Sequence, residues 1–266
     1  MTMVRLDDRA VLRVAGADAR SFLQGLLTQD VDRLAADRPL YAGLLSPQGK
    51  ALFDMLLFDG GDDAVLIDIA VDRAAALVRR LAMYRLRKAV TIETTSLAVF
   101  AGWGGSGAGQ AADPRFAELG TRWIGPAGGE TGATDYDAHR LAIGVPGSAD
   151  IGEDALLWLE TGADLLGGVS FTKGCYIGQE NTARMHHRDK VRRRLVPVTF
   201  DGSAGDGVVR DAAGHAAGSL RSHRGGRGIV HLRLAAAAGP LVLNGTAVVV
   251  AAPAWLAPAL HAATAT

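Results

Sequence analysis

The only cysteine of the chain lies in a segment whose neighbouring residues could activate a thiol. Cys175 belongs to the run Lys173-Gly174-Cys175-Tyr176-Ile177-Gly178-Gln179-Glu180. A lysine ammonium favours the thiolate form, and a helix beginning near Ile177 would direct its positive N-terminal end toward the same sulfur. Gly174 permits the backbone angles of an exposed turn. A small buried cysteine is the alternative, and these neighbours favour a reactive thiol instead.

A second candidate is an acid on an apolar strand. Asp54 lies within the run Ala51–Phe58, which is otherwise apolar. A carboxylate seldom occurs in such a strand unless it serves a site, so the position points to binding or catalysis. Metal binding is not expected: His186 and His187 are adjacent rather than spaced as a ligand pair, and a single cysteine cannot hold an iron–sulfur cluster by itself.

The cysteine segment resembles the signature of the YgfZ family, which reads Lys-Gly-Cys-Tyr-x-Gly-Gln-Glu. The chain matches it from Lys173 to Glu180 at every fixed position, including Tyr176, Gly178 and Gln179. Other segments resemble that family in the same order along the chain; they are Leu27–Val31, Leu45–Lys50, Tyr84–Lys88, His139–Pro146 and Lys190–Val198. These proteins bind folate and are related to the T-protein, the aminomethyltransferase of the glycine cleavage system.

The resemblance implies a set of folate-binding residues. A pterin ring needs a carboxylate or amide opposite its ring nitrogens, and the anionic glutamate tail needs arginine or lysine. Glu160 resembles the acid that contacts folate in this family, and its alternative is a solvated helix-end acid. Tyr84, Arg85 and Arg140 lie in matching segments and could stack on the pterin or neutralise the tail. Surface arginines and a core tyrosine are the equally plausible alternative for these three.

Asp54 also bears on catalysis. T-proteins carry two adjacent aspartates on the corresponding strand, and one is needed for one-carbon transfer. Here the pair reads Phe53-Asp54, so one acid remains, and the resemblance implies that Asp54 could bind folate without catalysing the transfer. The resemblance therefore implies an accessory factor that binds tetrahydrofolate, or another reduced folate, and supports iron–sulfur proteins or their assembly machinery, including enzymes of tRNA modification. Within the motif, Cys175 and Lys173 would carry the chemistry, and we lean against independent enzymatic activity. A folate-dependent aminomethyltransferase is the first alternative.

The basic run Arg184–Arg194 suggests a further alternative, an RNA-binding module. It contains six basic residues and one acid, Asp189. The run could contact RNA weakly, receive a folate tail or an acidic partner, or be a solvated helix end. Equal numbers of basic and acidic residues, 28 of each, disfavour a dedicated RNA-binding protein.

The elements that must position these residues indicate an α+β protein. Strands are predicted at Ala10–Val14, at Ala89–Thr94 and at Leu97–Ala101, and a hairpin is predicted from Ala51–Phe58 and Ala64–Ala70. Helices are predicted from Asp18, as N-cap, to about Leu27 and from Asp72 to about Arg87. The glycine-rich stretch Gly102–Gly109 lacks the ending of a phosphate-binding loop and is interpreted as a connection. Gly125–Thr134 reads as a loop and Leu141–Val145 as a strand.

The last third of the chain has a different pattern. Short strand-like runs at Leu195–Phe200, Val208–Arg210, Gly228–Leu234 and Leu241–Ala251 alternate with glycine turns, which is typical of a small antiparallel barrel. We expect two domains: residues 1–192, a folate-binding module of two intertwined subdomains, and residues 193–266, the β-barrel. The resemblance implies a T-protein-like fold, with ferredoxin-like subdomains around a central folate-binding hole.

Composition sets the outer limits. Hydrophobic residues make up 48% of the 266 residues and charged residues 21%, as in ordinary globular proteins. No segment has the apolar length of a signal peptide or a membrane-spanning helix, so membrane association is not expected. A single cysteine fits a reducing compartment, and the prediction is a cytoplasmic protein.

Overall fold

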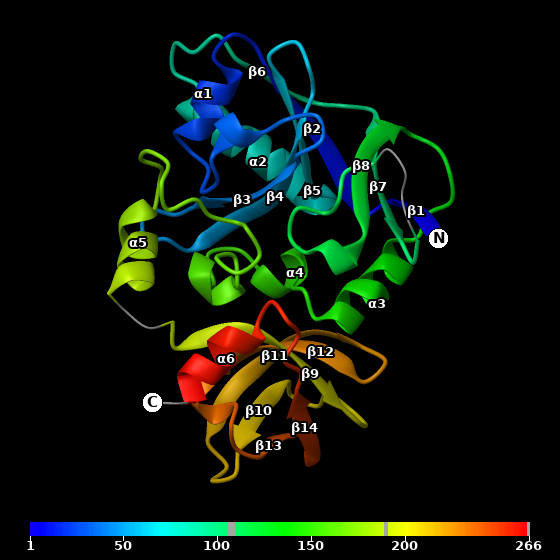
Figure 1. Cartoon of the computed structure of the whole chain (residues 1–266), viewed down its shortest axis with the longest axis vertical. Coiled ribbons are helices and arrows are strands. Elements are labelled where there is room, and N and C mark those ends of the chain that lie inside the picture. The colour runs from blue at the N-terminus through cyan, green and yellow to red at the C-terminus, as the bar shows by residue number, and fades with distance from the viewer. Residues whose placement is uncertain (106–109, 189–190, 265–266) are drawn as a thin grey trace.

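The computed structural model describes residues 1–105, 110–188 and 191–264. An α/β body forms the upper part of the molecule and a β-barrel the lower part (Figure 1). The predicted α+β class with a C-terminal antiparallel barrel is confirmed. Part of the predicted connection Gly102–Gly109 lies outside the described residues. Within the described ranges, no helix is both long and apolar enough to cross a membrane.

The first sheet forms because its strands bury side chains on both faces. Its order is β3-β4-β5-β2-β6 with antiparallel pairing. The strands are β2 (Arg9–Ala15), β3 (Leu40–Leu45), β4 (Ala51–Asp59), β5 (Ala64–Ala70) and β6 (Thr91–Thr94). In β2, Leu12 and Val14 pack in one hydrophobic cluster with α1 (Ala19–Gln24) and α2 (Val71–Tyr84). Val11 belongs instead to the cluster of the second sheet, as the two-residue period of a strand requires.

The second sheet has three antiparallel strands in the order β1-β7-β8. They are β1 (Thr2–Leu6), β7 (Leu97–Trp103) and β8 (Thr121–Pro126), and α3 (Ala133–Ile143) packs against this sheet through Tyr136. Short helical turns complete the body; they are η1 (Val31–Arg33), η2 (Ala117–Leu119), α4 (Ser148–Ile151) and η3 (Trp158–Thr161). After them come the cysteine segment and α5 (Gln179–His187).

Six strands close the C-terminal barrel. Their order is β10-β11-β12-β9-β14-β13, and every pairing is antiparallel. The elements are β9 (Arg193–Phe200), β10 (Val208–Asp211), β11 (Ala216–Arg224), β12 (Arg227–Arg233), η4 (Leu234–Ala236), β13 (Leu241–Leu243), β14 (Thr246–Val250) and α6 (Ala257–Thr264). Closure leaves no sheet edge exposed to other chains.

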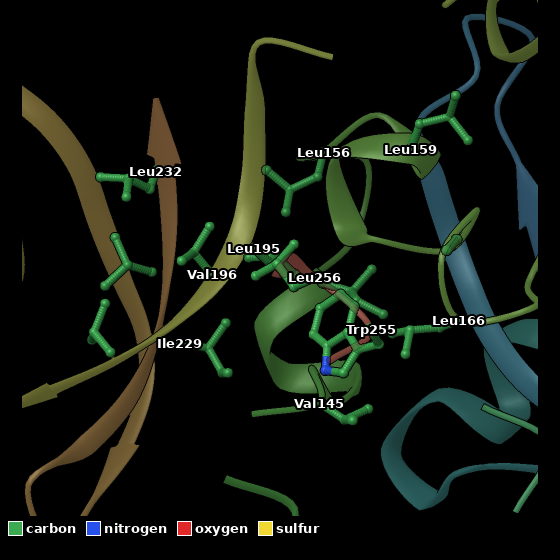
Figure 2. Close-up of a cluster of buried hydrophobic side chains, with 14 of the residues drawn as sticks. Val145, Leu156, Leu159, Leu166, Leu195, Val196, Ile229, Leu232, Trp255 and Leu256 are labelled. Carbon is green, nitrogen blue, oxygen red and sulfur yellow. The ribbon is translucent and has the colours of Figure 1, made fainter. Parts of the chain in front are cut away.

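One hydrophobic cluster joins the barrel to the body. Figure 2 shows side chains from the strands β9 and β12 converging with those of the loop and turn from Leu156 to Leu166 and with Trp255. Leu195, Ile229 and Leu159 are each almost completely buried there. The two parts therefore share a core rather than meeting only at their surfaces.

Some sequence predictions need correction. Leu141–Val145 is not a strand: Tyr136, Arg140 and Leu141 are buried on one face of α3, which is helical spacing. Asp18 occupies the N-cap position of α1 as predicted, but its carboxylate accepts a hydrogen bond from the Ala89 N–H at 2.8 Å and makes no capping bond to the helix. Helix α1 ends at Gln24, earlier than expected. Strand β8 runs to Pro126 and so includes the first two residues of Gly125–Thr134, the stretch interpreted as a loop. Strand β11 was not predicted.

Candidate functional site

The cysteine segment leaves its thiol on the surface. Cys175 is exposed and unpaired, between the buried side chains of Lys173 and Tyr176. Helix α5 begins at Gln179, two residues later than expected, and its first turn carries the acidic side chain of Glu180. The structure thus places an accessible thiol in a loop just before a helix N-terminus.

Lys173 anchors this loop to the body. Its ammonium donates to the backbone carbonyl oxygens of Gln24 and Leu27, both at 2.7 Å, and of Gln29 at 2.9 Å. It also lies 5.4 Å from the centre of the Tyr176 ring. Burial lowers the pKa of Lys173 to about 8, although Asp30 and Asp32 oppose that shift. These contacts make Lys173 an anchor between the loop and the end of α1, whereas the sequence suggested a charge aimed at the thiol.

The two glycines of the motif have different roles from those expected. Gly174 does not adopt a positive φ, and a Cβ there would meet nothing within 4 Å. Gly178 does, with φ 81°, and a Cβ there would lie 2.5 Å from the Ser46 carbonyl oxygen and 3.1 Å from Gly49 Cα. The special backbone requirement therefore falls on Gly178, which packs against the turn between β3 and β4.

A polar cavity of about 500 Å³ lies beside β4, β5, α3 and α4. Its lining includes two of the expected folate residues, Asp54 and Arg140. Four further arginines and four further acids line it; they are Arg9, Arg73, Arg115, Arg122, Asp8, Asp72, Asp137 and Glu153. The volume falls within the range of small-molecule sites.

Only one of the two carboxylate oxygens of Asp54 has a hydrogen-bond partner among the described residues. Ser148 Oγ donates to Asp54 Oδ2 at 3.0 Å, and Arg9 Nη1 donates to the same serine oxygen at 3.1 Å. The other carboxylate oxygen, Oδ1, accepts no hydrogen bond from the residues that the structure describes. Asp54 therefore offers a free acceptor at the cavity wall, where a donor of a bound molecule could reach it.

A buried ion cluster contributes Arg9 and Arg122 to the lining of the same cavity. Asp68 is fully buried and binds Arg9 Nε at 2.6 Å and Arg122 Nη2 at 2.8 Å. Burial alone would raise the pKa of Asp68, but the two guanidinium groups hold it below its usual value. Arg122 is itself buried, and its Nη1 has no hydrogen-bond partner among the described residues. An unpaired buried donor is costly, so this nitrogen lowers the stability of the cluster.

Arg140 has little left to offer a ligand. Its Nη1 donates to the Val145 carbonyl at 2.7 Å and to Asp150 at 2.8 Å. Its Nε and Nη2 both donate to Asp137, at 3.1 and 2.5 Å. Arg140 therefore lines the cavity mainly as a brace between α3 and α4, and it contributes positive charge rather than free donors.

The other three expected folate residues do not line this cavity. Glu160 Oε2 accepts the Leu157 N–H at 3.2 Å and lies 3.5 Å from His231 Nε2 of the barrel. Tyr84 packs against the first-sheet cluster at the end of α2, and Arg85, the next residue, is exposed. The structure brings together Asp54 and Arg140, and it separates both from Cys175, which lines neither described cavity.

Sequence reasoning missed Arg9, Arg122 and Ser148. One signal was present: Asp68 lies in the apolar run Ala64–Ala70, as Asp54 lies in its own strand. The same argument would have marked Asp68 as a site or a buried ion partner. Nothing in the sequence pairs it with Arg122, which is 54 positions away.

Comparisons with known proteins identify the family. The CAF17 C-terminal beta-barrel domain matches residues 192–258. The chain is 38% identical over 280 residues to "Iron-sulfur cluster assembly factor IBA57, mitochondrial" of Homo sapiens, covering 89% of this chain and 79% of that protein. The chain belongs to the IBA57 family. The mouse protein of the same name is 35% identical over 90% of this chain and 80% of its own length.

The cysteine motif resembles that of the YgfZ family, but the matched relatives are named IBA57, so the family of this chain is IBA57. The fold matches the aminomethyltransferase T of the glycine cleavage system from Bartonella henselae, with a TM-score of 0.77 and 15% identity over 95% of this chain and 85% of that one. The T-protein-like fold is therefore confirmed. The expectation of a cytoplasmic protein is wrong, because the relatives from human, mouse and Coccidioides immitis are all named mitochondrial.

Proposed function

We propose that this IBA57-family chain is a mitochondrial iron–sulfur cluster assembly factor that binds a reduced folate and presents Cys175 to iron–sulfur proteins or their assembly machinery. The names of its relatives support the assembly role. Clients among the iron–sulfur enzymes of tRNA modification, as the YgfZ resemblance implies, are part of the proposal. One-carbon transfer is not, because Phe53 replaces one acid of the T-protein pair.

The observation that carries the folate part is the unsatisfied acceptor at the cavity wall. Asp54 Oδ1 accepts no hydrogen bond from the residues that the structure describes. A pterin ring displays N–H donors that this oxygen could accept. The arginines around the cavity suit the anionic glutamate tail. The residues present therefore fit a folate in charge, polarity and volume.

When bound, the folate would act as a conformational ligand, since one-carbon transfer is not part of the proposal. Asp54 would hold the ring N–H groups, with Ser148 and Arg9 keeping the Asp54 carboxylate in place. Cys175 is exposed and does not line the cavity. Folate binding and thiol chemistry are therefore separable by mutation.

Calorimetric titration with tetrahydrofolate tests this proposal. Wild-type protein should show saturable binding, and Asp54→Asn should weaken it about tenfold or more, because a hydrogen bond to a charged group is lost. Glu160→Gln should change the affinity by less than about threefold, since Glu160 does not line the cavity. Asp59→Asn, at the far end of the same strand, is the matched control. No heat at high folate concentration, or equal loss in all three variants, would refute the assignment.

A deletion strain tests the assembly role independently. We expect several iron–sulfur enzymes to lose activity when the gene is deleted and to recover it with the wild-type gene but not with Cys175→Ala. Unchanged enzyme activities in the deletion strain would contradict the assembly role, whatever the folate titration shows.

A further inference from the structure

A second cavity, of about 560 Å³, lies where the barrel meets α5 and α6. It is bounded by α5, η3, the start of β9, η4 and α6, and it shares no lining residue with the polar cavity around Asp54. We call it the junction cavity. The basic run marked in the sequence contributes Arg192, Arg193 and Arg194 to its wall.

Two guanidinium groups at the junction cavity, those of Arg192 and Arg193, have free donors, and a third, that of Arg194, is buried. Arg194 is 5% exposed and binds Asp164 through both terminal nitrogens, at 2.7 and 2.8 Å, yet its Nε has no partner among the described residues. Arg192 and Arg193 form no ion pair or side-chain hydrogen bond within the described part of the chain. Among the lining residues that the structure describes, Asp164 is the only acid and is already paired, so this described lining carries a net positive charge.

Apart from Arg233, which is paired with Asp211 at 3.1 Å, and His186, the rest of the described lining is aliphatic. Leu159, Met185, Val191 and Leu234 line it together with four alanines, three of which belong to α6. The one ring in the lining is His186, and it is already stacked on Phe171 with ring centres 3.6 Å apart. An occupant that matched these walls would have a flexible saturated body rather than a flat heterocycle.

We propose that the junction cavity binds an aliphatic anion, in which a carboxylate or phosphate heads a saturated chain. The head group would bind the free donors of Arg192 and Arg193, because guanidinium groups form charge-assisted hydrogen bonds with either anion, and the buried Arg194 would stay paired with Asp164. The chain would lie on the aliphatic floor. RNA fits less well, because Arg194 is buried in its pair with Asp164 and no tyrosine, tryptophan or phenylalanine lines the cavity for base stacking.

Titration with decanoate and decyl phosphate, below their micelle concentrations, tests the proposal and distinguishes the two head groups. At least one should bind saturably to the wild-type protein. Decanol, which has the chain without the charge, and inorganic phosphate, which has the charge without the chain, should bind at least tenfold more weakly. Saturating tetrahydrofolate and the Asp54→Asn substitution should leave the affinity for the aliphatic anion unchanged. A failure of the folate proposal would therefore not affect this result.

Two variants locate the ligand. Arg193→Gln should weaken binding about tenfold, as expected for the loss of a charge-assisted hydrogen bond. Arg227→Gln, an exposed arginine elsewhere on the barrel, should have no effect. Ala259→Leu should narrow the cavity and weaken the long-chain anion more than butanoate, with thermal melting used to verify the fold.

Three results would overturn the inference: no saturable binding of either anion, equal affinities in Arg193→Gln and Arg227→Gln, or binding of a polyuridine oligonucleotide that decanoate does not displace. The last result would assign the basic run to nucleic acid.

Discussion

The ammonium of Lys173 is buried and holds the cysteine loop against the end of α1. It makes three bonds to backbone carbonyl oxygens that follow or end that helix, where the helix dipole favours a cation. Removing it would leave three carbonyl groups without that donor. The effect of Lys173 on function would therefore act through the position of the loop that carries Cys175.

Lys173→Met tests this anchoring. We expect the free energy of unfolding to fall by about 2–4 kcal/mol, because buried polar groups lose a charged partner. Lys50→Met is the matched control, since Lys50 makes one exposed hydrogen bond, to the Asp154 carbonyl. That variant should lose less than about 1 kcal/mol. Urea unfolding followed by circular dichroism measures both, and equal losses would contradict the anchoring role.

Cys175 itself should be dispensable for the fold. Because the side chain is exposed, Cys175→Ala should leave the melting temperature and folate affinity nearly unchanged while abolishing complementation in the deletion strain. Iodoacetamide should label the native wild-type protein without unfolding it, as followed by mass spectrometry. Slow labelling together with full complementation by Cys175→Ala would show that the thiol has no role in assembly.

At the scale of residues, the sequence identified individual candidate residues but not the residues that they contact. The motif around Cys175 and the acid at Asp54 stood out from residue type and local context alone. The roles of Lys173 and Arg140 did not, because their partners lie on segments that only the folded chain brings near. The prediction that Glu160, Tyr84 and Arg85 bind folate stays untested. None of the three lines the polar cavity: Glu160 bonds to the Leu157 N–H, and Tyr84 packs against the first-sheet cluster.

At the scale of elements, Asp68 connects the two sheets of the body. It lies on β5, and its carboxylate binds Arg9 of β2 in the first sheet and Arg122 of β8 in the second. Its lowered pKa means that the ionised form stabilises the folded state. Above the usual pKa of an aspartate this stabilisation is complete, and it is lost as the pH falls toward the lower pKa of the folded protein.

Asp68→Asn should therefore destabilise the protein in a pH-dependent way. At pH 7 we expect a loss of about 3–5 kcal/mol, because two buried arginines lose their counter-ion. The difference from the wild type should shrink below about pH 4.5, where the unfolded aspartate begins to take up a proton. Urea unfolding at several pH values measures this. A difference that stays constant from pH 7 to pH 4 would contradict the ionic role.

The sequence predicted elements well wherever hydrophobic periodicity was strong. Strands β2, β4 and β5 and helix α2 follow such patterns closely. Helix α3 was partly read as a strand because Leu141–Val145 is a short apolar run, and periodicity cannot distinguish the two structures over five residues. Strand β11 was missed because Ala216–Arg224 is mostly polar and buries few side chains.

At the scale of the molecule, the barrel and the body share one hydrophobic cluster. Leu195 and Ile229 of the barrel, Leu159 of the body and Trp255 of the segment before α6 all belong to it (Figure 2). The buried pair of Arg194 and Asp164 crosses the same boundary. The division at residues 192 and 193 stays a prediction, and a shared core argues that neither part is stable alone.

The protein should therefore unfold in a single step. Differential scanning calorimetry should show one transition for the wild type. Trp255→Ala should lower that transition as a whole rather than split it, at a cost of about 3–5 kcal/mol for a buried aromatic side chain. Val249→Ala, at an exposed barrel position, is the control. Two resolved transitions in the wild type would show that the parts fold independently.

The empty space beside Gly174 has a consequence for how the thiol is reached. Gly178 must lack a side chain for the chain to fold, but Gly174 need not, because a methyl group there would touch nothing. Gly174→Ala should thus cost the fold little. Under the proposed presentation of Cys175 to a protein partner, the added methyl group would stand beside the thiol and hinder the docking of that partner. A small reagent such as iodoacetamide should reach the thiol of Gly174→Ala as easily as that of the wild type.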